Sequence, residues 1–134
     1  MKKVMTFGTF DIFHKGHKDF FRQAREFGNY LIVVIARDKT VESVKNRLPQ
    51  NSECDRLQTI VKSNLANKTV LGNLTDKYAV IKKYQPDIIC LGYDQKVDLK
   101  ELKKKLIEFD LRETKLVRLN PFYPEKYKSS KLRK

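Results

Sequence analysis

The chain has 134 residues, a length that favours one domain built around one core. Hydrophobic residues make up 40% and charged residues 34%, with only 5 Gly and 4 Pro, which excludes a disordered or low-complexity chain. Basic side chains outnumber acidic ones by 29 to 16, so the net charge of +13 favours anionic partners such as nucleotides, phosphorylated metabolites, nucleic acid or acidic lipid.

Segments typical of strands and of helices alternate along the chain. The continuous apolar run at 30–36, YLIVVIA, is typical of a strand buried on both faces of a parallel sheet. Phe20, Ala24 and Phe27 are spaced as one face of a helix. We predict strands at 3–7, 30–36, 68–71, 88–92 and 115–119, helices at 16–27, 53–65, 75–84 and 99–109, and an irregular polar segment at 37–52.

This order predicts an α/β domain with a mostly parallel sheet of about five strands and right-handed crossovers. We expect a single domain over 1–134 that ends in a basic segment at 120–134. Ligands bind such sheets at the carboxyl ends of the strands, where the strand order reverses. The segments 6–17, 36–47 and 92–95 follow predicted strands and are polar, so we expect the site there.

The segment Gly8–His17 carries the strongest chemical signal. His14 and His17 stand three residues apart where a loop meets a helix, so both rings can face one site, and Gly16 between them permits close approach of a ligand. The start of the helix offers free N–H groups and a positive dipole end to an anion. Two imidazoles that donate to a phosphorus centre would stabilise the charge that grows in a transition state.

Two other readings of this segment are weaker. A metal half-site would lack a third ligand, and we predict no protein-held metal. Two unrelated surface histidines would leave Gly8, Asp11 and Gly16 unexplained.

The frame GTFD-IF-H-K-G-H resembles the signature of the cytidylyltransferase-like nucleotidyltransferase superfamily, whose HxGH box cradles a triphosphate. The resemblance extends over nearly the whole chain. It implies a Rossmann-like three-layer α/β/α fold and a homodimer. It also implies transfer of a nucleotidyl group from an NTP to a phosphorylated acceptor by in-line displacement, with Mg²⁺ that arrives with the NTP and with release of pyrophosphate.

The resemblance also assigns roles to individual residues. His14 and His17 would contact the phosphates, while Thr9, Phe10 and Gly16 would line the nucleotide pocket. Asp11 would order its loop or face the substrate. Three cations, Lys45, Arg47 and Arg56, lie where the family places groups that clamp the triphosphate or the acceptor, although each alone could be a solvated surface residue.

Two later segments complete the resemblance. Gly92 and Asp94 belong to a loop similar to the family's nucleotide-base loop. Lys128, Ser129 and Ser130 resemble the closing Ser/Thr motif that binds phosphate. The glycerol-3-phosphate and choline-phosphate cytidylyltransferases carry an Arg and a Gly shortly before that motif, whereas this chain has NPFYPEKY at 120–127.

Two sub-families compete for the substrate. The opening MKKV-T-GTFD resembles glycerol-3-phosphate cytidylyltransferase, which uses CTP. More segments, among them 36–41, 70–72, 86–89 and 91–95, resemble archaeal-type FAD synthase, which transfers AMP from ATP to FMN, and we prefer this reading. A nucleic-acid-binding module or an inert nucleotide binder remains as a non-enzyme alternative, although no nucleic-acid motif is legible.

Apolar runs are too short for a membrane span of roughly 20 residues, and the N-terminus turns polar at Gly8 before a signal-peptide core could form. We therefore expect a cytoplasmic protein without a membrane partner. Cys54 and Cys90 have no partner motif, and Cys90 lies within an apolar run.

Overall fold

A computed structural model describes residues 2–93 and 95–121. Its centre is a five-stranded sheet in the order β3-β2-β1-β4-β5, and every neighbouring pair is parallel. The strands are β1 (Lys3–Gly8), β2 (Tyr30–Ile35), β3 (Lys68–Leu71), β4 (Ile88–Leu91) and β5 (Lys115–Arg118). The predicted α/β class, strand number and parallel arrangement are confirmed.

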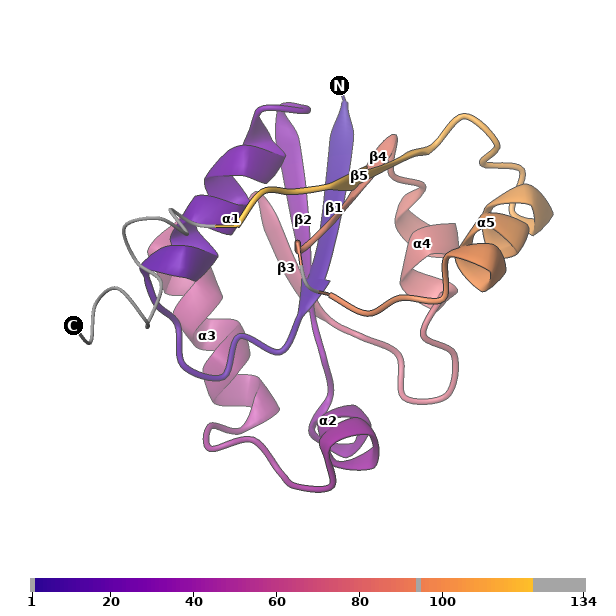
Figure 1. The fold of residues 1–134 in the computed structure, drawn as a ribbon. Coiled ribbons are helices and arrows are strands. Elements are labelled where there is room, and N and C mark those ends of the chain that lie inside the picture. Colours follow the sequence, from indigo (N-terminus) through magenta and orange to yellow (C-terminus); the bar gives the residue numbers. More distant parts are fainter. Residues whose placement is uncertain (1, 94, 122–134) are drawn as a thin grey trace.

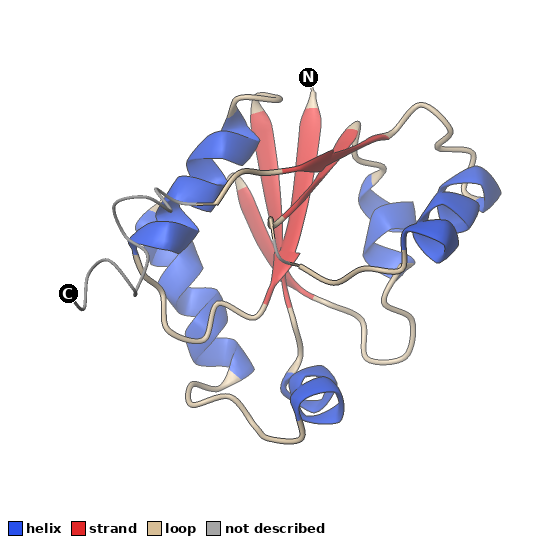
Figure 2. Ribbon diagram, in the orientation of Figure 1, coloured by secondary structure: helices blue, strands red, loops and turns tan. Residues whose placement is uncertain are grey.

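Helices cover both faces of this sheet, which gives the predicted three layers (Figures 1 and 2). The helices are α1 (Lys15–Arg25), α2 (Asp38–Lys45), α3 (Glu53–Ser63), α4 (Ala79–Tyr84) and α5 (Leu99–Glu108). The α1 and α3 helices cover one face of the sheet, and α4 and α5 cover the other. The α2 helix stands beyond the carboxyl ends of the strands (Figure 1).

The core has two halves, one on each face of the sheet. Alternate residues of β2 point to opposite faces: Val33 packs with α1 and α3, whereas Ile32 packs with α4 and α5. Five of the six β2 residues are buried, which confirms a strand covered on both faces. Burial of these apolar side chains stabilises the fold by roughly 25 cal/mol per Å² of apolar area removed from water.

The helices differ from the prediction in three places. In α1 the buried anchor is Phe21, while Phe27 lies beyond the helix and is 39% exposed. The segment predicted to be irregular contains α2, which has a single buried residue, Val41, and therefore no apolar stripe to reveal it. The α4 helix begins at Ala79 rather than at position 75, because Asn73 and Asp76 hold a turn before it with their side chains.

The topology fixes where a ligand can approach. The chain moves from β1 outward to β2 and β3, then returns past β1 to β4 and β5. The strand order thus reverses between β1 and β4, and the loops after these strands diverge to opposite faces. This point of divergence lies beside the start of α1, where the histidine motif falls.

Candidate functional site

His14 and His17 form a capping arrangement at the start of α1. The backbone N–H of Gly16 donates to Nδ1 of His14 over 3.0 Å, and the backbone N–H of His14 donates to Nδ1 of His17 over 3.3 Å. The two rings stack with centroids 3.8 Å apart. Because each Nδ1 accepts a hydrogen bond, each neutral ring carries its proton on Nε2.

The start of α1 is therefore a site that combines side-chain donors with the positive end of a helix. The helix has 11 residues with no acidic side chain in its first turn. The backbone N–H groups of Gly16, His17 and Lys18 already donate to His14, so the two imidazole Nε2–H groups are donors that remain for a ligand. The arrangement can bind several oxygens of an anion such as a polyphosphate.

The His17 ring is uncharged at neutral pH, because its pKa is lowered. Burial first, and then the neighbouring His14, lower the pKa of His17 from 6.5 to about 4. His17 is thus an uncharged hydrogen-bond donor at neutral pH. The positive end of α1 supplies charge that the neutral His17 ring does not.

In the loop after β1, the Phe10 ring closes over Gly8. A side chain at Gly8 would meet the Phe10 ring, whose Cζ lies 2.5 Å from the ideal Cβ position. The space beside Gly8 is therefore filled by the Phe10 ring. Phe10 is only 6% exposed and has the left-handed backbone value φ 52°. Its ring belongs to the core, and the predicted role of Thr9 and Phe10 in a nucleotide pocket stays a prediction.

Asp11 joins two loops of the site. Its carboxylate accepts hydrogen bonds from the backbone N–H groups of Gln50 and Asn51, both over 2.8 Å. Burial alone would raise the pKa of Asp11, but these hydrogen bonds and the charge of Arg56 outweigh it and lower the pKa. Asp11 therefore adopts the first of its two expected arrangements, ordering of the loop, while a contact with the substrate stays a prediction.

Arg56 lies buried among the same loops, with 1% of its surface exposed. Its Nη1 donates to the carbonyls of Thr9 (2.9 Å) and Ala36 (2.8 Å), which follow β1 and β2. Its Nε donates to the carbonyl of Asn51, and its Nη2 pairs with Asp38 over 2.7 Å. The solvated-surface reading of Arg56 is thus wrong, and its contact with an acceptor phosphate stays a prediction.

Hydrogen bonds between Asp38 and Glu53 join the two ends of the segment 38–53, which contains α2. The backbone N–H of Asp38 donates to Glu53 over 2.8 Å, and the backbone N–H of Glu53 donates to Asp38 over 3.2 Å. Arg37 adds an ion pair to Glu53 over 3.0 Å. We call this reciprocal contact of Asp38 and Glu53 the clasp.

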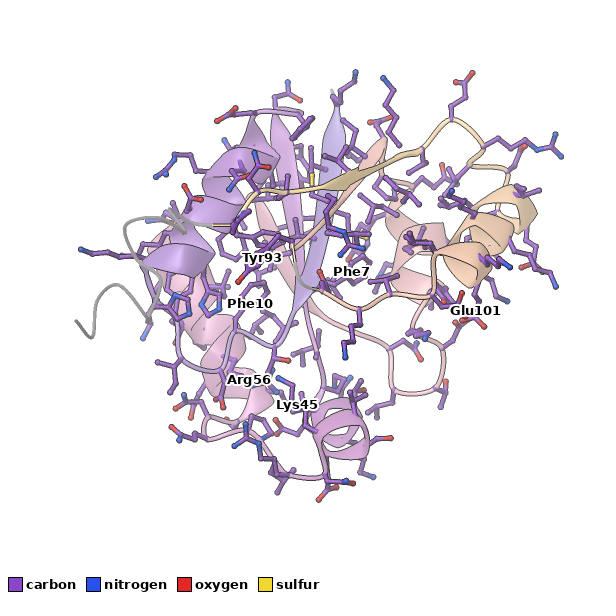
Figure 3. The ribbon with its side chains drawn as sticks, in the orientation of Figure 1. Phe7, Phe10, Lys45, Arg56, Tyr93 and Glu101 are labelled. Carbon is purple, nitrogen blue, oxygen red and sulfur yellow. The ribbon has the colours of Figure 1, made fainter. Side chains whose placement is uncertain are left out.

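Lys45 and Arg47 lie in the middle of the segment that the clasp closes. Lys45 is in the last turn of α2, and Arg47 follows the left-handed cap Asn46. Both are exposed, and within residues 2–93 and 95–121 neither forms an ion pair. Figure 3 shows Lys45 and Arg56 toward the same end of the molecule, below Phe10. Their role toward a substrate stays a prediction.

The loop after β4 is fixed by a residue that the sequence analysis missed. Arg118, the last residue of β5, donates from Nη1 to the carbonyls of Gly92 (2.8 Å) and Gln95 (2.5 Å). Gln95 in turn accepts from the N–H of Gly92 and donates to the carbonyl of Phe7. The sequence contains an indication of this role. Arg118 lies near the carboxyl end of a predicted strand, and the predicted site lies at that same edge of the sheet.

Four predicted site residues lie outside the described residues: Asp94, Lys128, Ser129 and Ser130. The chain that leads toward the last three runs along α1, where Gln23 and the backbone of Asn120 exchange two hydrogen bonds of 2.9 and 3.0 Å. The chain after β5 is thereby directed to the face of the sheet on which the histidine motif lies.

Other chemistry is limited in the described part of the chain. No group of three or more His, Cys, Asp or Glu side chains is placed to hold a metal ion there. Cys54 is exposed and Cys90 buried, both free thiols, and burial raises the pKa of Cys90 to about 12. None of the described helices has the length and apolar character needed to cross a membrane.

Comparisons with known proteins agree with the motif. A family model described as Cytidylyltransferase-like matches residues 5–134. The FAD synthase of Aciduliprofundum boonei is 40% identical over 122 residues, covering 91% of this chain and 80% of that protein. The FAD synthase of Thermoplasma acidophilum is 35% identical over 134 residues, covering 100% and 93%.

A solved structure gives the same result for the fold. The crystal structure of the lipopolysaccharide core biosynthesis protein from Thermoplasma volcanium matches with a TM-score of 0.84 and 35% identity, covering 91% of this chain and 98% of that one. Family model, relatives and fold all extend over most of the chain. The chain therefore belongs to the cytidylyltransferase-like family and is a nucleotidyltransferase.

Proposed function

We propose that this nucleotidyltransferase is an FMN adenylyltransferase, which makes FAD and pyrophosphate from ATP and FMN. The observation that carries the proposal is the identity of 35–40% with FAD synthases along nearly the full chain. A homodimer and a cytoplasmic location belong to the proposal as expectations from the family resemblance and from the sequence.

The reaction is an in-line displacement at phosphorus. An oxygen of the FMN phosphate attacks the α-phosphorus of ATP, and the bond from that phosphorus to the bridging oxygen of pyrophosphate breaks. The attacking phosphate is already ionised, so no protein nucleophile or general base is required. The protein contributes by positioning the two phosphates and by stabilising the charge that spreads over the oxygens.

The donors at the start of α1 fit this requirement. In the proposal, the Nε2–H groups of His14 and His17, which lie at the positive end of α1, bind triphosphate oxygens. Mg²⁺ enters as part of the Mg·ATP substrate, held by phosphate oxygens and water. Lys45 and Arg47 are exposed and supply positive charge toward the acceptor phosphate.

The flavin needs an aromatic or apolar surface. Tyr93, in the loop after β4, has 58% of its surface exposed and offers a ring to a planar ligand. It lies on the loop that Arg118 holds, near the carboxyl end of β4 (Figure 3). We propose that this loop contacts one of the two ring systems of the substrates.

The test is pyrophosphate release with Mg²⁺, with ATP and CTP each paired with FMN, glycerol 3-phosphate and phosphocholine. We expect turnover with ATP and FMN. Turnover only with CTP and a phosphorylated alcohol would overturn the flavin assignment and keep the reaction type. No turnover in any pairing would leave the proposed activity without support.

Variants connect the activity to the site. His14→Asn and His17→Asn each remove one donor to the triphosphate, and we expect kcat to fall about 100-fold or more. Lys45→Gln should raise KM for the acceptor, while Lys39→Gln, a change of an exposed lysine on the same helix, is the matched control. Equal effects of the two lysine changes would argue against a role for Lys45.

A further inference from the structure

His17 is enclosed by three rings. The His14 ring stacks on it at 3.8 Å between centroids, and the Phe13 ring lies nearly parallel to it at 5.8 Å and 11°. The Phe10 ring meets it edge-on at 5.2 Å and 85°. Two of the three neighbours are therefore apolar side chains that have no part in phosphate binding.

Both phenylalanines are anchored in the core. Phe10 belongs to the core cluster on the α1 and α3 face, and its ring is 5.1 Å from that of Phe21. Phe13 packs against the same cluster, with its ring 5.9 Å from Phe21. We call the Phe10 and Phe13 rings the walls of His17. Their positions are fixed by the folded core and do not depend on a bound ligand.

The backbone at Phe10 is strained in order to place its ring. A φ of 52° is uncommon for a residue with a bulky side chain. The ring also occupies the space beside Gly8, which only the absence of a Cβ leaves free. Such strain persists where the surrounding structure holds it, and it gathers at functional sites. Its result here is an aromatic edge against His17.

We propose that Phe10 and Phe13 are positioning residues that hold the His17 imidazole with Nδ1 on the His14 amide and Nε2 available to the phosphate site. The rings limit rotation of the imidazole, and the hydrogen bond from the His14 N–H selects which nitrogen accepts. The inference rests on the proposed function for its purpose, because a fixed Nε2–H is useful where an oxyanion is to be bound.

The charge state of His17 agrees with this enclosure. Burial is the largest cause of its lowered pKa, and the phenylalanines make up two of its three ring neighbours. Among the described residues, the neighbouring charged or titratable groups are His14, which lowers the pKa further, and Lys18, whose Nζ is 5.9 Å from the centre of the Phe13 ring. Removing a wall should therefore let water reach the imidazole and favour its protonation.

The test is NMR of the histidine side chains in the full chain without nucleotide or flavin. Long-range ¹⁵N–¹H correlations distinguish a ring protonated on Nε2 from one protonated on Nδ1. We expect His17 to be in the Nε2–H form and to titrate near pH 4. A parent protein with His17 in the Nδ1–H form, or titrating near the ordinary 6.5, would overturn the proposal without any variant.

Variants then separate the walls from the rest of the core. In Phe10→Leu and Phe13→Leu we expect a mixture of the two protonated forms and a titration midpoint that moves from about 4 toward 6.5. Phe20→Leu is the matched control, because the Phe20 ring contacts those of Phe10 and Phe21. If Phe10→Leu does not fold, Phe13→Leu tests the proposal by itself, because Phe13 is only half-buried.

An unchanged His17 in both folded wall variants would contradict the proposal, as would an equal change in Phe20→Leu. The readout needs no substrate, so it does not depend on whether the acceptor is FMN. A failed activity assay with a confirmed Nε2–H form would reject the proposed function and leave the positioning role standing.

Discussion

The buried guanidinium of Arg56 unites three loops that are far apart in the sequence. It donates to carbonyls at Thr9, Ala36 and Asn51 and pairs with Asp38. Those carbonyls end or precede regular elements, so they have no partner within a helix or strand at that point. One side chain thus satisfies three backbone carbonyls from separate loops.

Arg56→Ala should therefore be strongly destabilising. Removing one member of a buried ion pair typically costs about 3–5 kcal/mol, and we expect the lower end because the Asp38 side chain remains 30% exposed. The measurement is the free energy of unfolding from urea titration. Lys105→Ala, which breaks the exposed pair with Glu108, is the control and should change stability by less than about 1 kcal/mol. Similar losses in both variants would refute the structural role.

At the scale of elements, α2 buries fewer residues than any other described helix. It buries only Val41, whereas the adjacent α3 buries Arg56 and Ile60 and packs Leu57 against the core. Opening α2 exposes little apolar surface, so its local free energy of opening should be low. The helix that carries Lys45 is thus held mainly by its ends.

Hydrogen exchange measured by mass spectrometry checks this difference. We expect backbone amides of α2 to exchange at least about tenfold faster than those of α3 in the protein without ligand. The comparison is internal to one sample, so solvent conditions cannot produce the difference. Equal protection of the two helices would show that the single buried residue understates how firmly α2 is held.

The same contrast explains what the sequence could predict. Strand β2 and helix α3 carry long apolar patterns, and their bounds follow from those patterns. The α2 helix has one buried position, which gives no periodicity to detect. The burial of Arg56 depends on three loops that meet only in the fold, and the Phe10 ring beside Gly8 depends on a left-handed backbone that no local pattern announces. The histidine pair was readable because its spacing is local.

At the scale of the whole molecule, the site titrations make stability depend on pH. His17 has a folded-state pKa of about 4 against 6.5 when unfolded, so the unfolded chain binds more protons between these values. Its contribution is fully present above pH 6.5 and is lost as the pH falls toward 4. Asp11 acts in the same direction below 3.8, because its folded-state pKa is lowered.

We therefore expect the free energy of unfolding to fall as the pH drops from 6.5 to 4, and to fall further below 3.8. Urea titrations at steps of pH measure the slope. His17→Asn should flatten the upper part of the curve and Asp11→Asn the lower part. A parent protein with constant stability between pH 4 and 6.5 would contradict the lowered pKa of His17.

The clasp between Asp38 and Glu53 has a consequence for how such a site diversifies. Its two partners are 15 positions apart, and they fasten the entry and exit of the segment that holds Lys45 and Arg47. Residues inserted or deleted between 46 and 49 would then change the reach and shape of that segment while the sheet and the histidine pair keep their places. In the proposed function, where Lys45 and Arg47 face the acceptor phosphate, a change in the length of this segment would alter the acceptor site without moving the histidine pair.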